Sequence, residues 1–375
     1  MKKIGILGGG QLGKMLCLAA ADWHLETLVL DKKGCSAENY CACFIEGDFK
    51  NYEDVLNFGR LCDVITIEIE HVNTDALQKL EEEGKSVYPS AKNLRIIADK
   101  GLQKKFYNTF GFPSANYTLL ENKNMLSVYF DREGSFPCVW KSCRGGYDGK
   151  GVAVLKSLQD TASLPDVEYI IEDMVTIEKE ICVMAARNVS GEVAVYTPVE
   201  MVFDEKANLL DYQICPAGIT RQQGMQARKI AEKLIRKLDL VGVLAVEMFL
   251  TKSGEILINE SAPRPHNSGH HTIEACVTSQ YEQHLRAILN LPLGSTKLTS
   301  PSVLWNILGA ESYYGNAKVE GFDEALKIQS AYFHFYGKKT TQPFRKMGHA
   351  TVLNKNGGKA LEDVFKLKKI LRVIA

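Results

Sequence analysis

The sequence predicts an α/β protein, α+β in part, that is divided into two or three domains. The chain has 375 residues, which exceeds the size at which a single hydrophobic core usually stops growing. It opens with a strand, a glycine turn, a helix and a second strand, an order typical of parallel α/β sheets. After Gly111–Ser114 the pattern changes to short strands with few helices. This change indicates a second, more β-rich architecture.

Composition limits the classes of function. Lysine plus arginine and aspartate plus glutamate each number 45, so no bulk field attracts nucleic acid or an anionic membrane. The ten cysteines form no CxxC pair, which argues against zinc and suits a reducing compartment. Gln11 and Lys14 interrupt the apolar start, and no apolar run reaches the roughly 18 residues that span a bilayer. We therefore expect a cytoplasmic protein without a membrane or nucleic-acid partner.

The first element is a strand at Lys3–Leu7, followed by glycines at 8, 9, 10 and 13 and a helix at Gln11–Ala21. A strand at 27–30 then ends in Asp31. Residues 8–13 fit GxGxxG, and Asp31 lies about where a dinucleotide fold places its ribose-binding acid. Two interpretations remain open at this point. One is a nicotinamide site, and the other is a glycine turn needed only for close packing.

The next buried strand, Val64–Ile67, runs into Glu68, Glu70 and His71. Open α/β sheets bind ligands at the carboxyl ends of their strands, although a polar strand end alone explains the pattern equally well. Helices are expected at Asp75–Glu83 and Asn93–Phe110.

A glycine-rich segment, Lys141–Gly151, marks the second part of the chain. Four glycines within seven residues allow backbone amides to approach phosphate oxygens closely, and Lys141 adds charge. The alternative is a flexible hairpin tip. The strands expected around this segment are Ala115–Leu119, Cys138–Ser142, Val152–Leu155, Tyr169–Glu172, and then 180–188 and 192–200, before a loop at Asp204–Leu210.

Two strands joined by a turn at Lys252–Gly254 carry the strongest chemical signal. Glu247 lies on the first strand, and Asn259 and Glu260 lie on the second. If the strands pair antiparallel, the two carboxylates meet on one face and repel unless they are neutralised. Hard oxygen ligands of this kind suit a Mg²⁺ ion that also holds substrate phosphates.

The loop after Glu260 offers Arg264, His266 and Asn267, which need partners or a ligand if they are buried. His270 and His271 are expected to pack or hydrogen-bond locally. Helices are expected at 222–238, at Thr272–Leu289 and at the end of the chain, with strands at Ser302–Leu308, Ala331–Tyr336 and Gly348–Leu353. Lys338, Lys339, Arg345 and Lys346 crowd one connection, which is either a solvated basic loop or a phosphate clamp.

Several runs together resemble the ATP-grasp superfamily and, within it, the N5-carboxyaminoimidazole ribonucleotide synthetase family. They are GGGQLGKML (8–16), EIEHVN (68–73), RGGYDGKG (144–151), VGVLAVEMF (241–249), NESAPRPHNSGH (259–270), SQYEQHLRAI (279–288) and FRKMGH (344–349). The resemblance implies a Rossmann-like domain at 1–97, a two-lobed ATP-grasp domain at 98–295 and a small β-rich domain at 296–375. Within the ATP-grasp domain, 98–185 would carry the glycine flap and 186–295 the metal site.

The resemblance also implies the reaction. ATP phosphorylates bicarbonate to carboxyphosphate, and the amine of 5-aminoimidazole ribonucleotide takes the carboxyl group in purine biosynthesis. The products are N5-carboxyaminoimidazole ribonucleotide, ADP and phosphate. A flap that excludes water suits such a labile intermediate. The family usually forms homodimers, and a homodimer is expected here.

By motif position, the resemblance assigns roles to individual residues. The flap would comprise Gly146, Tyr147, Asp148, Gly149, Lys150, Gly151 and Val152. The other ATP contacts would be Lys100, Lys141, Glu172, Asp173, Met174, Val175, Glu180, Asn259 and Glu260, with Mg²⁺ held by Glu247 and Glu260. Glu70, Tyr147, Lys150, Arg264 and His266 would be catalytic. Gln11, Leu12, Asn267, Lys338, Arg345 and Lys346 would bind the ribonucleotide.

The chain departs from the family pattern in places. Lys150 and Lys100 stand where arginine occurs in family members, so a planar bidentate contact is lost there. The segment 201–212 lacks the HNxH pattern, and no nucleotide contact is carried over to it. Three rival functions remain: a nicotinamide oxidoreductase, a non-catalytic nucleotide-binding regulator, and a formate-using glycinamide ribonucleotide transformylase.

Overall fold

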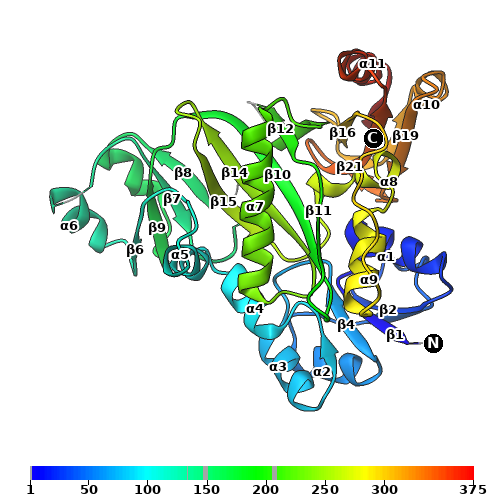
Figure 1. Ribbon diagram of the computed structural model, residues 1–375, viewed down its shortest axis with the longest axis horizontal. Coiled ribbons are helices and arrows are strands. Elements are labelled where there is room, and N and C mark those ends of the chain that lie inside the picture. The colour runs from blue at the N-terminus through cyan, green and yellow to red at the C-terminus, as the bar shows by residue number, and fades with distance from the viewer. Residues whose placement is uncertain (1, 133, 147–150, 205–208) are drawn as a thin grey trace.

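The computed structural model describes residues 2–132, 134–146, 151–204 and 209–375. Its N-terminal part is a parallel five-stranded sheet in the order β3-β2-β1-β4-β5, drawn in blue in Figure 1. Apolar side chains on one face of the sheet pack against α1, and those on the other face pack against α2, α3 and α4. The prediction of a Rossmann-like α/β domain that opens with a βαβ unit is therefore confirmed. The elements are β1 (Lys3–Leu7), α1 (Gln11–Ala21), β2 (Glu26–Asp31), β3 (Cys43–Glu46), α2 (Tyr52–Arg60), β4 (Val64–Ile67), α3 (Thr74–Glu82), β5 (Ser86–Val87) and α4 (Ala91–Ile97).

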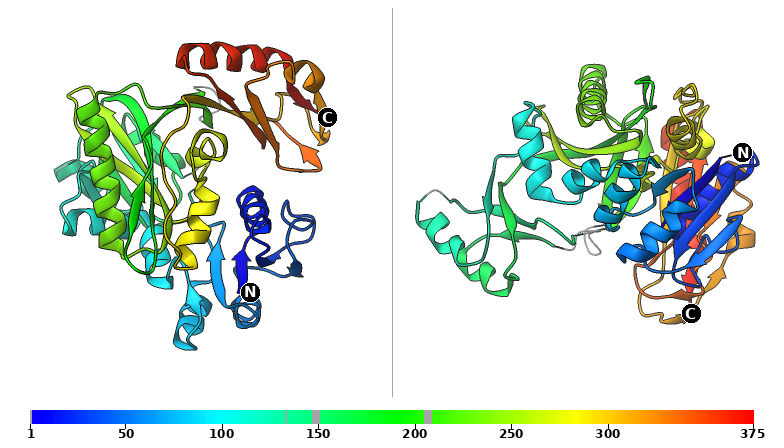
Figure 2. Two further views of the ribbon diagram at one scale, coloured as in Figure 1. Left: turned by 45° about the vertical axis from the view of Figure 1, so that its right-hand side comes forward. Right: turned by 90° about the horizontal axis from the view of Figure 1, so that it is seen from below.

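A small lobe follows α5 (Lys100–Thr109) and extends away from the rest of the molecule (Figures 1 and 2). Its antiparallel sheet has the order β6-β9-β7-β8 and packs its own apolar cluster around Trp140 and Tyr169. The elements are β6 (Tyr117–Leu120), α6 (Met125–Arg132), β7 (Cys138–Ser142), β8 (Val152–Leu155) and β9 (Tyr169–Asp173). We call this part the flap lobe, because the glycine-rich segment joins β7 to β8.

A nine-stranded sheet forms the body of the molecule, in the order β15-β14-β10-β12-β13-β16-β21-β19 with β11 beside β10. Helix α7 covers the β10–β14 end, and α11 packs against β16 and β21 at the other end (Figure 1). The strands are β10 (Ile177–Arg187), β11 (Val193–Val195), β12 (Val199–Asp204), β13 (Leu209–Cys215), β14 (Gly242–Thr251), β15 (Ile256–Ala262), β16 (Ser302–Leu308), β19 (Ala331–Phe335) and β21 (Lys346–Leu353). The helices are α7 (Arg221–Leu238), α8 (Thr272–Ala275), α9 (Gln280–Ile288), α10 (Phe322–Ala325) and α11 (Gly357–Ile370). Four short strands complete the tail: β17 (Gly315–Asn316), β18 (Lys318–Glu320), β20 (Thr340–Thr341) and β22 (Arg372–Ile374).

Helix α9 joins the N-terminal sheet to the large sheet, and it lies beside α1 in Figure 1. The buried His284 ring of α9 contacts both sheets. Its Nε2 lies 2.8 Å from Thr66 Oγ1 of β4, and its Nδ1 accepts from the Val243 N–H of β14 at 3.2 Å. Across the described ranges, no helix is both long enough and apolar enough to cross a bilayer.

Several expected boundaries were wrong. The helix expected at Asn93–Phe110 is two helices, because the Asp99 side chain caps α5 by accepting from Leu102 N at 3.0 Å. The helix expected at Thr272–Leu289 is also broken, since Ser279 caps α9 in the same way. Strands β12 and β13 extend into the segment expected to be a loop, Asp204–Leu210, since Phe203 pairs with Leu210 and Asp204 pairs with Leu209.

The change of sheet also comes earlier than expected. The flap lobe was expected to extend to residue 185. Strand β10 instead pairs with β14 over most of its length, so the flap-lobe sheet ends at Asp173.

Candidate active site

A cleft of about 590 Å³ lies where the three parts of the chain meet. This volume is within the range of small-molecule sites. Of the residues singled out from the sequence, the cleft is lined by Gln11, Leu12, Glu70, Lys100, Gly146, Glu247, Glu260, Arg264, His266, Asn267 and Lys346.

Two carboxylates face each other in this cleft. Glu247 of β14 and Glu260 of β15 are direct partners in the antiparallel ladder, as the sequence predicted. Burial and the neighbouring Glu260 and Glu180 carboxylates raise the pKa of Glu247 to about 8. Burial opposes ionisation of Glu260 as well, but its ion pair with Lys100 holds the pKa of Glu260 below the ordinary value. Ionisation of Glu247 is therefore disfavoured beside the Glu260 carboxylate, and a bound cation would favour it.

The donor set fits Mg²⁺, since two carboxylates leave coordination positions for substrate phosphates. Nothing within the described ranges gathers three or more His, Cys, Asp or Glu side chains into a metal-binding cluster.

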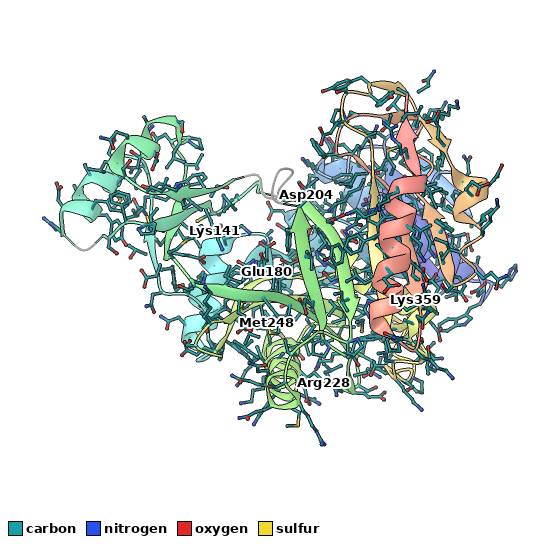
Figure 3. All side chains as sticks on the ribbon, turned by 90° about the horizontal axis from the view of Figure 1, so that it is seen from above. Lys141, Glu180, Asp204, Arg228, Met248 and Lys359 are labelled. Carbon is teal, nitrogen blue, oxygen red and sulfur yellow. The ribbon has the colours of Figure 1, made fainter. Side chains whose placement is uncertain are left out.

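A chain of ion pairs crosses from the flap lobe to the large sheet. Lys141 of β7 lies 2.7 Å from Glu172 Oε2 of β9 and donates to Asn259 Oδ1 of β15 at 2.8 Å. Lys104 of α5 pairs with the other Glu172 oxygen at 2.7 Å. Burial alone would raise the pKa of Glu172, but the two lysines hold it below its usual range. Figure 3 labels Lys141 in the flap lobe and Glu180 on the large sheet.

The loop after β15 carries a second set of polar groups. Arg264 Nη2 pairs with Glu70 Oε1 at 2.9 Å, and His266 Nε2 lies 3.7 Å from Glu247 Oε1. Asn267 Nδ2 donates to Asn306 at 3.1 Å, whereas its buried Oδ1 has no hydrogen-bond partner in the described part of the chain. An unpaired buried acceptor costs free energy unless a ligand satisfies it. His270 and His271 are buried and hydrogen-bonded, in agreement with the expectation of local packing.

Of the basic residues in the tail, Lys346 lines the cleft. Lys338 Nζ donates to the Lys346 carbonyl at 2.7 Å. Arg345 is turned toward Thr340, to whose carbonyl and hydroxyl oxygens it donates at 2.8 Å. Of the three residues assigned to the ribonucleotide phosphate, Lys346 therefore lines the cleft and Lys338 contacts the backbone of Lys346.

The flap falls largely outside the described residues, and this applies to Tyr147, Asp148, Gly149 and Lys150. Gly151 has φ +75°, and an added Cβ would meet Ser142 Oγ at 2.6 Å, so glycine is required there. Val152 begins β8. Asp173 and Met174 are exposed next to the partly buried Val175, and Glu180 is partly buried on β10.

The glycine turn at residues 8–13 is already hydrogen-bonded within the chain. Gly9 N–H donates to Asp31 at 2.7 Å, and Gly10 and Gly13 donate to Glu68 at 2.8 and 2.9 Å. Asp31 is thus turned to the backbone of the loop. This arrangement favours the close-packing interpretation over a nicotinamide site.

Sequence reasoning missed several groups near the cleft. Lys104 lies four residues after Lys100, a spacing that puts both on one face of α5 and was the available signal. The segment 201–212 was set aside for lack of a motif, yet Met201 and Phe203 of β12 and Leu209 and Leu210 of β13 line the cleft. Apolar residues that line a cleft cannot be distinguished by a sequence motif from apolar residues of the core.

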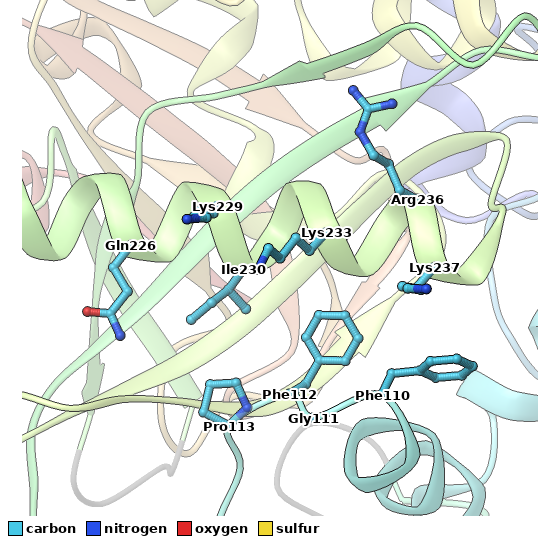
Figure 4. A pocket seen from close by; sticks show the side chains of 10 residues that line it. All are labelled: Phe110, Gly111, Phe112, Pro113, Gln226, Lys229, Ile230, Lys233, Arg236 and Lys237. Atoms are coloured by element: carbon cyan, nitrogen blue, oxygen red, sulfur yellow. The ribbon is translucent and has the colours of Figure 1, made fainter.

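A larger pocket of about 660 Å³ lies elsewhere, between the end of α5 and helix α7 (Figure 4). It is lined by Phe110, Phe112, Pro113, Ile230 and a row of exposed cations on α7. None of the catalytic, metal-binding or ligand-binding residues predicted from the sequence lines this pocket, so the smaller cleft is the candidate site.

Comparison with known proteins gives the class first. The ATP-grasp domain family matches residues 105–281, and the ribonucleotide synthetase preATP-grasp domain family matches residues 1–98. Fold and cleft therefore define an ATP-grasp protein. The phosphoribosylaminoimidazole carboxylase C-terminal domain family matches residues 302–363.

Relatives narrow the class further. The chain is 37% identical to N5-carboxyaminoimidazole ribonucleotide synthase of Bacillus subtilis, over 96% of this chain and 94% of that protein. It is similar to the N5-carboxyaminoimidazole ribonucleotide synthetase structure from Thermotoga maritima, with a TM-score of 0.92, 45% identity and full coverage of both chains. A third similar structure is the Aspergillus clavatus N5-carboxyaminoimidazole synthase in complex with ADP and 5-aminoimidazole ribonucleotide, at TM-score 0.90, 32% identity and 98% coverage of both chains. The chain belongs to the N5-carboxyaminoimidazole ribonucleotide synthase family of ATP-grasp ligases. It spans 63–66% of the length of yeast relatives named phosphoribosylaminoimidazole carboxylase.

Proposed function

We propose that this protein uses ATP to carboxylate 5-aminoimidazole ribonucleotide with bicarbonate in cytoplasmic purine biosynthesis. The observation that carries the proposal is that one cleft is lined by the Glu247–Glu260 pair, the Arg264–Glu70 pair and Lys346. These groups suit a metal-bound phosphate, a small carboxyl group and a ribonucleotide phosphate, respectively.

The ATP half of the site would comprise Lys100, Lys141 and Asn259, with Glu172–Val175 along the adenine edge and Glu180 at the ribose. Lysine ammonium groups supply point charges to phosphate oxygens. Glu247 and Glu260 would hold Mg²⁺, which neutralises phosphate charge when it is bound. Gly146–Val152 would form the flap that keeps water from the intermediate.

In the first step a bicarbonate oxygen attacks the γ-phosphorus of ATP, and the bond to the ADP oxygen breaks. In the second step the substrate amine attacks the carboxyl carbon of carboxyphosphate, inorganic phosphate leaves, and the nitrogen loses a proton. Glu70 would accept that proton with Tyr147, and Lys150, Arg264 and His266 would hold the carboxyphosphate. The Arg264–Glu70 ion pair supports this division of roles, since it joins the anion-binding group to the base.

The ribonucleotide would lie against Gln11, Leu12 and Asn267, with its phosphate near Lys346, Lys338 and Arg345. The buried Asn267 Oδ1, which has no hydrogen-bond partner among the described residues, supports a contact with a hydrogen-bond donor on the substrate. The protein is also proposed to form a homodimer, which light scattering of the purified chain tests directly.

The decisive experiment is a coupled ADP-release assay in which each acid is combined with each acceptor. Bicarbonate with aminoimidazole ribonucleotide should release ADP and give a product 44 mass units heavier, the mass of an added CO2 by elementary stoichiometry. ADP release that needs formate and glycinamide ribonucleotide would overturn the proposal in favour of the transformylase. Nucleotide binding without ADP release under any combination would favour the non-catalytic regulator.

A further inference from the structure

The glycine turn that opens the chain encloses a carboxylate of the same chain. Glu68 follows β4, and its two oxygens accept from Gly10 N–H at 2.8 Å and Gly13 N–H at 2.9 Å. Helix α1 begins at Gln11, and Gly10 has no side chain with which to cap it. The first N–H groups of a helix lack intrahelical acceptors and carry partial positive charge. Glu68 supplies both the acceptors and the countercharge.

In dinucleotide-binding folds this position takes a phosphate group. The glycines of this chain are instead fitted to the glutamate. An added Cβ at Gly8 or Gly10 would collide with Glu68 side-chain atoms. At Gly13 it would collide with the Gly8 carbonyl oxygen at 2.7 Å, a contact independent of Glu68. Gly8 and Gly10 therefore leave room for an internal anion.

Glu68 also stands two residues before Glu70, whose carboxylate pairs with Arg264 at 2.9 Å. Gln11 and Leu12, the first residues of α1, line the same cleft. One side chain thus ties the end of β4 to the start of α1, and both of these segments contribute groups on the ribonucleotide side of the cleft. The ATP-side residues Lys141 and Asn259 lie on other elements.

We propose that Glu68 is a positioning residue, an internal substitute for the phosphate group of a dinucleotide, and that it fixes Glu70 and Gln11 for the ribonucleotide. The claim that Glu68 positions groups for the ribonucleotide rests on the proposed function. The structural part of the proposal is the energetic coupling between Glu68 and Gly10.

A double-mutant cycle tests that coupling without any substrate. Gly10 has φ −70°, so alanine there meets no backbone strain. Gly10→Ala should lower the thermal midpoint by about 5 °C or more in the native background and by about 1 °C in the Glu68→Ala background. Gly59→Ala is the matched control, since its added Cβ would collide with Leu80 of α3 and not with Glu68, and it should lower the midpoint equally in both backgrounds. Equal losses for Gly10→Ala in both backgrounds would overturn the proposal.

The kinetic test uses Glu68→Gln, which keeps the shape and one acceptor. The Michaelis constant for aminoimidazole ribonucleotide should rise by about tenfold, while that for ATP stays within about twofold, because only the ribonucleotide side is displaced. Equal changes in both constants would mean that Glu68 serves stability alone and would overturn the positioning role. If no acid and acceptor pair releases ADP, the proposed function fails, but the thermal cycle still decides the structural part.

Discussion

Lys141 and Asn259 join two separate sheets, since the Lys141 ammonium donates to Asn259 Oδ1 at 2.8 Å across the boundary between flap lobe and large sheet. Asn259 directly precedes Glu260, so this contact links the flap lobe to the carboxylate pair.

Replacing Lys141 by methionine should raise the Michaelis constant for ATP. A hydrogen bond to a charged group contributes about 1.5–3 kcal/mol, which corresponds to roughly 10- to 150-fold in affinity. Steady-state ADP release at varied ATP measures this, and Lys156→Met, an exposed lysine of the same lobe, is the control. An unchanged constant for ATP would remove Lys141 from the nucleotide site.

Lys104→Met should destabilise the fold. Among the described residues it leaves the buried Glu172 carboxylate with one ion-pair partner, Lys141, and breaking a buried pair costs about 3–5 kcal/mol. Urea unfolding should show the loss, whereas the adjacent exposed Lys105→Met should change the midpoint little. Equal midpoints for the two variants would contradict the importance of the buried pair.

Glu260→Gln should reduce turnover by at least about 100-fold, because it removes one of the two proposed anionic metal ligands. Titration with Mg²⁺ should show weaker activation at every concentration. Glu255→Gln, in the turn of the same hairpin, serves as the control. Native rates for Glu260→Gln at ordinary Mg²⁺ would refute the metal role.

In the basic tail, Lys338→Ala should raise the Michaelis constant for the ribonucleotide more than that for ATP. Lys346→Ala should have the larger effect, because Lys346 lines the cleft while Lys338 donates to its carbonyl. Initial rates at varied ribonucleotide measure both, and Lys355→Ala is an exposed control. Equal effects on both substrates would indicate a folding role instead.

Acid should destabilise the protein from about pH 6.5 downward through two buried histidines. Burial lowers the pKa of His271 to about 4 and that of His284 to about 3, from 6.5 in the unfolded chain. The unfolded chain then binds more protons, so stability is lost as pH falls, by up to about 1.4 kcal/mol per pH unit for each histidine. The loss of stability levels off once the pH falls below the pKa values of these two histidines in the folded protein.

Urea midpoints between pH 7 and 4.5 measure that slope. His284→Gln should make the dependence of stability on pH shallower by the contribution of one histidine. His24→Asn, at an exposed position, should leave this dependence unchanged. Identical slopes for the native protein and His284→Gln would show that His284 is not the acid-sensitive group.

The fold could be predicted where local patterns decide it. The opening βαβ unit and the Glu247–Glu260 hairpin follow from apolar runs, a glycine turn and a tight Lys252–Gly254 turn. The breaks before α5 and α9 could not, because an Asp99 or Ser279 cap competes with a helical pattern that continues on both sides. Strand β13 was missed although it pairs with the neighbouring β12, and its other partner, β16, lies about ninety residues further along the chain.

For the candidate site, too, local motifs could be predicted from the sequence and tertiary contacts could not. Charged residues in motifs were found, and many of them meet in one cleft. The pairing of Lys104 with Glu172 and of Glu68 with the glycine turn depends on tertiary contacts between distant residues. Neither contact has a signature in spacing alone.

The pairing of β13 with β16 has a wider consequence, because it carries one sheet without interruption from Glu260 in β15 to Lys346 in β21. Glu260 and Lys346 are proposed to lie at the ATP end and the ribonucleotide-phosphate end of the site. Their separation is therefore set by strand spacing and twist within one sheet rather than by a hinge. The C-terminal region would thus form one side of the proposed site, and a chain cut before Ser302 should lose both this spacing and the proposed phosphate contact of Lys346.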